Sequence, residues 1–456
     1  MLFNSLAFFA LLLPTLLLYW ASSSQQFRLL LLVAASLMFY GFYYWPVVLL
    51  LLSVIPFNFV MGRAQIPGRS KIALGLAVAM NFSLLCWFKY VPFIVDNVNA
   101  GLSFFGTTLS VPRPPVFLPL GISFFTFQVV AYQIDIYRGE IKAETSLLRF
   151  AVFKCFFPQL IAGPIVRAKD FLPQLYEKVT FDAAIFHQGV WLVIAGLFLK
   201  IGVADILAQF ANEAFRAPSN LTTVSAWTGL YAYSVQLFAD FWGYSTIAIG
   251  LAALFGFALP LNFDTPYLST SLQEFWRRWH ITLSLWFRDY VYIPLGGSRQ
   301  HRNLNLLATM MLVGLWHGAG WTFVIWGVAH GLWLSVERSL PSSENMKGPV
   351  SRAVKTFLVF NGVCLLWVLF RAPTFSVAME YFSRLLLPPF TGSKVPPVLY
   401  GWLIVFALIH WPLAWSLKES RFIRLPLKLQ WVLALVCVYF ILAYAGAKVD
   451  FIYFTF

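Results

Sequence analysis

The chain has 456 residues, of which 60% are hydrophobic and only 11% are charged, and its mean hydropathy is +0.75. This composition excludes an ordinary set of soluble domains and predicts one all-α membrane domain over residues 1–456. The net charge of +14 comes from basic residues spread between apolar segments, so it favours a positive-inside topology and argues against nucleic-acid binding.

Apolar stretches long enough to cross a hydrocarbon core of ~30 Å recur along the chain. About eleven transmembrane helices are expected, at residues 4–21, 28–45, 46–62, 72–89, 116–134, 187–207, 223–242, 321–338, 355–371, 398–416 and 430–447. The first has no basic residue before it, unlike a signal peptide, and is expected to remain uncleaved. Lys and Arg concentrate in four loops, which are expected to be cytoplasmic with both termini on the opposite side: 63–71, 277–302, 338–355 and 418–428.

Residues 156–166 do not fit an ordinary spanning helix. Pro158, Gly163 and Pro164 interrupt this apolar run. A re-entrant or kinked element is therefore expected, enclosed by protein or water because lipid cannot satisfy its backbone groups.

Asp240 is a carboxylate within the apolar stretch 223–242. A charge at that depth needs a partner, for which an arginine or a histidine is expected. It is expected to organise a cavity rather than to react.

The segment 274–302 reads EFWRRWHITLSLWFRDYVYIPLGGSRQHR, and a single helix would sort its first part onto two faces. One face would be apolar, with Trp276, Trp279, Leu283, Trp286 and Tyr290, and the other polar, with Arg277, His280, Ser284 and Arg288. This pattern predicts an amphipathic helix at the membrane interface. Five arginines would either anchor it to anionic headgroups or bind a ligand's phosphates: Arg277, Arg278, Arg288, Arg299 and Arg302.

The next apolar segment, 303–317, ends in Leu315-Trp316-His317-Gly318. If Arg302 lies at the cytoplasmic surface, a rise of 1.5 Å per residue carries His317 only ~20 Å into a core of ~30 Å. His317 is therefore expected inside the membrane, beside a Gly318-Ala319-Gly320 turn that protein or water must enclose. An ionisable group there is a functional candidate, with a packing role as the alternative. Structural or supporting roles are expected for three further histidines, His187, His330 and His410.

The sequence contains no GxSxG, GxxxxGK[ST] or HExxH motif, and its four cysteines have no metal-ligand spacing. These absences argue against hydrolase, ATPase and metalloprotease functions, and no metal site is expected. A deep histidine without an evident partner nucleophile suits general-base catalysis, in which it takes a proton from an attacking hydroxyl or thiol. Such chemistry is typical of acyl transfer.

Six motifs lie between residues 120 and 456: LGISF at 120–124, FPQLIAGP at 157–164, DFWGYS at 240–245, EFWRRWH at 274–280, LWHG at 315–318 and FIYFTF at 451–456. Together they resemble the membrane-bound O-acyltransferase family, especially its bacterial branch that O-acetylates exopolysaccharides such as alginate or cellulose. The resemblance implies an all-helical fold around a central tunnel, with His317 as the catalytic histidine and His280 as a second recurrent histidine. Trp242 and Thr246 depart from the alginate pattern Asp-Phe-Ser-Gly-Tyr-Ser-Asp, which leaves the acceptor open.

The resemblance also implies a donor that enters from the cytoplasm, acetyl-CoA or an acyl carrier, and no tightly bound cofactor. It implies a bacterial inner-membrane location and an extracytoplasmic acetyltransferase-like protein that receives the acetyl group. The residues expected to bind the donor or line the tunnel are Arg277, Arg278, Ser284, Arg288, Asp240, Tyr244 and Trp316. Three alternatives remain open: D-alanyl-type transfer to a cell-wall polymer, a proton-coupled transporter using Asp240 and His317, and a scaffold for polysaccharide export.

Overall fold

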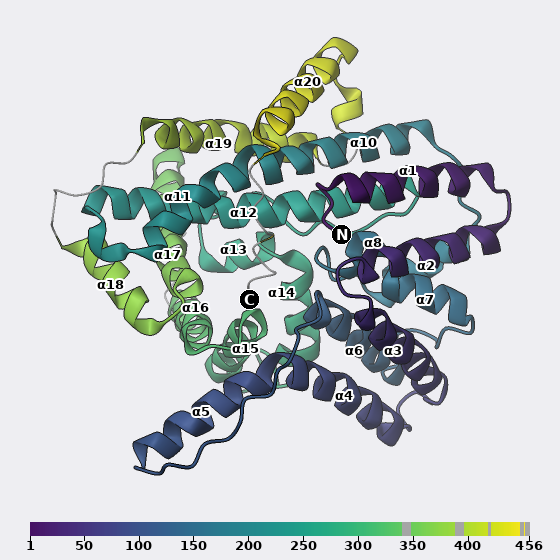
Figure 1. The fold of residues 1–456 in the computed structure, drawn as a ribbon, viewed down its shortest axis with the longest axis horizontal. Coiled ribbons are helices and arrows are strands. Elements are labelled where there is room, and N and C mark those ends of the chain that lie inside the picture. The colour runs from purple at the N-terminus through teal and green to yellow at the C-terminus, as the bar shows by residue number, and fades with distance from the viewer. Residues whose placement is uncertain (340–347, 388–395, 418–420, 447–450, 452–456) are drawn as a thin grey trace. The chain divides into compact units, whose positions relative to one another are not determined.

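A computed structural model describes residues 1–339, 348–387, 396–417, 421–446 and 451 of the chain (Figure 1). Helices are the only secondary-structure elements in these residues that run over several residues. Seven helical segments are long and apolar enough to cross a membrane. This confirms the prediction of an all-helical polytopic membrane protein. A helix lies at each of the predicted spans, but several are too short or too polar to qualify, so the number of crossings stays a prediction.

Some predicted features fall partly outside the described residues. They are the middle of the loop 338–355, the start of the loop 418–428 and residues 452–456 of the last motif. The topology predicted from the loops and the termini therefore remains a prediction.

The chain divides into two compact units, and the first comprises residues 1–186 and 251–260. Its main helices are α1 (Leu6–Ala21), α2 (Gln25–Gly41), α3 (Pro46–Arg63), α4 (Lys71–Leu85), α5 (Val91–Phe104), α6 (Ile122–Tyr137) and α7 (Leu147–Cys155). Short turns follow as α8 (Phe157–Leu160), α9 (Ala168–Phe171) and the 3₁₀ helix η2 (Leu172–Leu175), and a π-helical turn, η1 (Cys86–Tyr90), joins α4 to α5. Helix α8 has only four residues before the chain leaves helical geometry, which confirms the predicted interruption near Pro158.

Side-chain amides hold α3, α4 and α6 together inside the first unit. Asn58 and Asn81 donate to each other's Oδ1 atoms over 3.3 and 2.8 Å, and Gln133 Nε2 donates to the Asn58 carbonyl over 2.8 Å. In an apolar setting these groups have few other partners, so the bonds fix how the helices are rotated against each other.

The second unit comprises residues 187–250 and 261–456. Helix α10 (Ala183–Leu197), the π-helical segment η3 (Phe198–Ala204) and α11 (Asp205–Arg216) form one continuous stretch, and α12 (Thr223–Leu254) is the longest single helix; α10 and α12 each cross the boundary between the units. The remaining elements are η4 (Pro218–Asn220), η5 (Pro266–Leu268), α13 (Leu272–Arg278), α14 (Ile281–Phe287), η6 (Arg288–Tyr292), α15 (Arg302–His317), α16 (Trp321–Ser339), α17 (Pro349–Arg371), α18 (Phe375–Leu386), α19 (Pro397–Ser416), η7 (Phe422–Arg424) and α20 (Leu427–Tyr444).

Helices α15 and α16 form a tight antiparallel hairpin, seen side by side in Figure 1. Glycine at two positions allows the close approach. A Cβ atom on Gly314 would lie 2.2 Å from the Phe323 carbonyl oxygen, and one on Gly327 would lie 2.2 Å from the Met310 carbonyl oxygen. The hairpin therefore fixes the position of the residue at its tip, His317, against α16.

Candidate functional site

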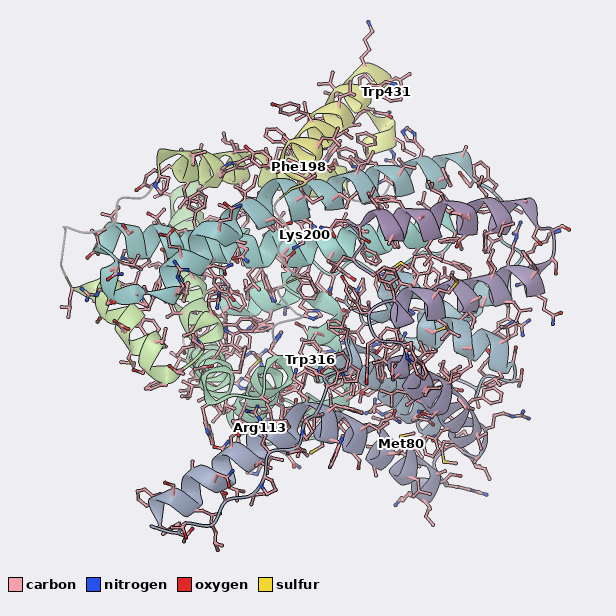
Figure 2. The ribbon with its side chains drawn as sticks, in the orientation of Figure 1. Met80, Arg113, Phe198, Lys200, Trp316 and Trp431 are labelled. Atoms are coloured by element: carbon pink, nitrogen blue, oxygen red, sulfur yellow. The ribbon has the colours of Figure 1, made fainter. Side chains whose placement is uncertain are left out.

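His317 is the last residue of α15, and the chain turns over Gly318–Gly320 before α16 begins, as the sequence predicted. Its side chain is buried at 3% exposure. Its ring centroid lies 5.4 Å from that of Trp326 and 5.1 Å from that of Phe370, with both rings edge-on. The neighbouring Trp316, labelled in Figure 2, is also buried, and its ring lies 4.9 Å from His317. The histidine thus sits in an aromatic enclosure built by α15, α16 and α17.

The prediction of one continuous helix through residues 274–290 is wrong. Helix α13 ends at Arg278, Trp279 is extended, and His280 has a left-handed φ of 42° before α14 begins. Two backbone hydrogen bonds of 2.9 Å cause the break, from Ile281 N–H to the Asn262 carbonyl and from Asp264 N–H to the Arg278 carbonyl. Tertiary pairing with residues 262–264 therefore overrides the helical periodicity.

The break carries His280 into the interior, where its exposure is 0%. Its ring centroid lies 6.5 Å from that of His317, 5.8 Å from that of Trp316 and 4.6 Å from that of Phe241. His280 lies outside the seven candidate spans, and burial lowers its pKa to about 3, so the ring is neutral near pH 7. The structure therefore brings together the two histidines named from the sequence.

A cavity of about 350 Å³ lies between α13, α14, α15 and α16. Its lining includes the polar residues Arg277, Ser284, Arg288, Thr309 and Arg338, together with Val313 and other apolar side chains. Arg277 and Arg288 are exposed, so the cavity is accessible at the end where these two side chains lie. Its wall on α15 includes Thr309 and Val313, and His317 follows at the same four-residue spacing. His317 thus lies one turn beyond the cavity on the same helix face.

The predicted arginine group is only partly at this cavity. Arg278 is turned away and pairs with Glu274 over 2.7 Å and with the Thr265 hydroxyl over 3.0 Å. Burial alone would raise the pKa of Glu274, but hydrogen bonds from Thr270 and the Arg278 guanidinium lower it overall, which keeps the carboxylate charged. Neither Arg299 nor Arg302 is among the lining residues.

Arg338 is a lining residue that sequence reasoning missed. In the sequence, Arg338 stands four residues after Leu334, which also lines the cavity. This spacing places both residues on one face of α16, with Arg338 in its last turn. The antiparallel hairpin returns this turn to the level where α15 starts.

Asp240 pairs with a lysine, not with the expected arginine or histidine. Lys200, which is labelled in Figure 2, has its Nζ atom 2.9 Å from Asp240 Oδ1 and 2.7 Å from Asp205 Oδ1, and all three side chains are at least nine-tenths buried. Lys200 belongs to the π-helical segment η3, whose irregular turn places Lys200 and Asp205 on one side. Since Asp240 precedes Phe241, the ion cluster fixes α12 next to His280.

Replacing Lys200 with methionine would leave two buried carboxylates without their cation. We expect the free energy of unfolding to fall by about 3–5 kcal/mol, the usual cost of removing one partner of a buried pair. Thermal unfolding of the detergent-solubilised protein would measure it. The matched control adds Asp205→Asn and Asp240→Asn, and it should recover much of the loss; equal instability of both proteins would contradict an electrostatic cause.

Tyr244 and Asp240 do not line the arginine-bearing cavity. Tyr244 instead stacks on Phe451, with ring centroids 4.4 Å apart, and Phe451 also contacts Phe241 at 6.1 Å. Of the residues predicted to bind the donor or line the tunnel, Arg277, Ser284 and Arg288 line this cavity, whereas Arg278, Asp240, Tyr244 and Trp316 do not.

Three similar proteins bear on this site. A probable alginate O-acetylase of Pseudomonas putida is 44% identical over 316 residues, 68% of this chain and 64% of that protein. A peptidoglycan O-acetyltransferase of Helicobacter pylori is 36% identical over 360 residues, 72% of this chain and 67% of that protein. A teichoic acid D-alanyltransferase of Streptococcus thermophilus is 31% identical over 284 residues, 55% of this chain and 68% of that protein.

A protein-family model matches residues 116–342 of the chain. This range contains both histidines and every residue that lines the cavity. The chain spans about 64% of the length of the alginate O-acetylase. The matched range and the 36% identity over two thirds of the peptidoglycan O-acetyltransferase confirm the resemblance seen in the six motifs. The chain belongs to the membrane-bound O-acyltransferase family.

Proposed function

We propose that this protein transfers an acetyl group across the bacterial inner membrane, from acetyl-CoA in the cytoplasm towards an extracytoplasmic acetyltransferase-like protein, for O-acetylation of a polysaccharide. The observation that carries the proposal is the cavity with arginines at its accessible end and His317 one turn beyond it on α15. The names of the related O-acetylases support the acetyl group and the polysaccharide class.

His317 acts as the general base in this proposal. It takes the proton from the acceptor hydroxyl as the oxygen attacks the thioester carbonyl, and the carbon–sulfur bond then breaks. The departing thiolate takes the proton from His317, so the base is regenerated and no net proton is consumed. The aromatic enclosure of Trp316, Trp326 and Phe370 excludes water that would otherwise hydrolyse the thioester.

The arginines hold the donor by its phosphates. Arg277, Arg288 and Arg338 line one cavity, and within the described part of the chain none of its lining residues is acidic, although Asp289 beside it pairs with Arg288 over 2.6 Å. Guanidinium groups bind phosphate oxygens through paired charged hydrogen bonds, and several of them suit the diphosphate and 3′-phosphate of CoA better than the single phosphate of a carrier-bound pantetheine.

Arg288→Ala is expected to raise the KM for acetyl-CoA about tenfold and to leave kcat nearly unchanged, because one charged hydrogen-bonded contact contributes about 1.5 kcal/mol. Initial rates in membrane vesicles at several acetyl-CoA concentrations would measure this. Arg299→Ala is the matched control, since Arg299 belongs to the same basic segment but does not line the cavity. An equal rise in both variants would indicate general attraction to anionic headgroups instead.

Labelled acetyl-CoA supplied to the cytoplasmic face of sealed vesicles tests the function itself. The label should appear on the extracytoplasmic protein or on the polymer. Transfer from D-alanyl carrier protein instead would favour the D-alanyl alternative, which the teichoic acid D-alanyltransferase similarity raises. Absence of transfer from either donor would contradict acyl transfer. Accessibility of terminal tags from outside the cell would test the predicted orientation.

A further inference from the structure

Asn262 is bonded on both sides of its side-chain amide. Its Oδ1 atom lies 3.1 Å from His280 Nδ1 and accepts hydrogen bonds from the Thr282 hydroxyl over 2.9 Å and from the Thr282 N–H over 3.3 Å. Its Nδ2 atom donates to the Ser245 hydroxyl over 3.1 Å. The side chain is 1% exposed, so water does not compete for these bonds. Asn262 thus links α12 to the segment that carries His280.

These contacts determine which nitrogen of His280 carries the proton. A backbone N–H only donates, so the amide atom facing Thr282 is the oxygen. An amide oxygen only accepts, so His280 Nδ1 must donate to it. A neutral imidazole carries one N–H, which makes Nε2 the nitrogen with the lone pair.

We propose that Asn262 is a positioning residue that holds His280 in the Nδ1–H tautomer, so that Nε2 accepts the hydrogen bond that stabilises His317 while it carries the transferred proton. The 6.5 Å between the ring centroids suits a contact through one bridging oxygen atom. The proposal rests on acyl transfer at His317 for its kinetic consequence, but the tautomer follows from the Asn262 contacts alone.

The backbone of His280 supports the same role. A left-handed φ of 42° on a non-glycine residue is strained, and such strain persists only where neighbouring contacts fix it. The Asn262 carbonyl accepts from Ile281 N–H over 2.9 Å while its side chain binds the His280 ring. One residue therefore holds both the strained backbone and the ring that it presents.

Nitrogen-15 NMR of the whole protein in lipid, with labelled histidine, tests the tautomer directly. The chain has six histidines, and His280→Gln would identify the signal of His280 by its loss. We expect that signal to show a protonated Nδ1 and an unprotonated Nε2. The opposite tautomer would overturn the proposal, and this result does not depend on any enzymatic activity.

Substitution of Asn262 tests the consequence. Asn262→Leu should reduce kcat 10- to 100-fold with little change in the KM for acetyl-CoA, as is usual when a partner that orients a functional histidine is lost. Asn262→Asp keeps an acceptor for Nδ1–H and should retain the tautomer and most of kcat. Thr282→Val is the matched control, because it removes another bond to the same Oδ1 atom but leaves the histidine contact, and it should change kcat by only a few-fold.

Three outcomes would overturn the positioning role. They are an Nδ1–H tautomer that survives in Asn262→Leu, equal losses in Asn262→Leu and Thr282→Val, or a rise in KM without a fall in kcat. If Asn262→Leu does not fold, Asn262→Asp and the spectrum of the unsubstituted protein still decide the question. If the unsubstituted protein shows the expected tautomer but transfers no acetyl group, the proposed function fails and the Asn262 contact stands.

Discussion

Replacing His317 with alanine is expected to reduce acetyl transfer by at least 100-fold, because a general base contributes about 10²–10⁴ to the rate. The loss should appear in kcat, since His317 lies beyond the cavity proposed to bind the donor. Label transferred from acetyl-CoA to the extracytoplasmic acceptor would measure the rate, and the acetyl content of the secreted polymer would report it in cells.

The control for this experiment is His187→Ala. His187 lies on α10 beside Phe422, with ring centroids 6.0 Å apart, and has no contact with the histidine pair in the described residues. The His187→Ala protein should retain transfer of the acetyl group. His317→Ala must also match the unsubstituted protein in expression and thermal stability. Full transfer by a correctly folded His317→Ala protein would contradict the base assignment and favour a scaffold, which does not need this side chain.

The position of His317 was predictable because a helix rises by a fixed distance per residue. The sequence places Arg302 and Gly318 at the two ends of one apolar segment, and α15 begins and ends at those positions. Length and composition therefore sufficed for the ends of this helix, and the depth of His317 in the membrane stays a prediction.

The position of His280 was not predictable in the same way. The apolar periodicity continues from Trp276 to Tyr290 as though one helix were present, and those residues are indeed buried. The break depends on hydrogen bonds to residues 262–264, which are separated from it in the sequence and carry no motif that marks them as partners. A lone asparagine such as Asn262 gives no sign of which distant ring it binds.

Ion pairs between helices inside the membrane are hard to predict from the sequence for the same reason. The sequence showed that Asp240 needed a cation, but Lys200 lies within the apolar stretch 187–207, where hydropathy marks it only as part of a span. Which cation faces Asp240 depends on how two helices are rotated against each other, and the π-helical turn at Lys200 changes that rotation locally.

Substituting Gly327 with alanine is expected to have a second large effect, on folding and catalysis together. Its Cβ atom would lie 2.2 Å from the Met310 carbonyl oxygen and 3.2 Å from the Gly314 Cα atom, so backbone rather than a flexible side chain would have to move. Separating α15 from α16 by about 1 Å would shift His317 against Trp326, and misplacement of that size reduces rates about 100-fold. We expect a lower unfolding temperature and a loss of transfer at least that large in the protein that still folds.

Gly320→Ala separates this effect from the general cost of altering the hairpin. Gly320 lies in the turn of the same hairpin, and a Cβ atom there would meet only the Phe323 ring at 3.6 Å, an ordinary contact. It should keep both stability and transfer close to those of the unsubstituted protein. Because alanine favours a helix more than glycine does, destabilisation by Gly327→Ala would run against intrinsic propensity and must come from the helix contact. A stable, fully active Gly327→Ala protein would show that the spacing of α15 and α16 does not control the position of His317.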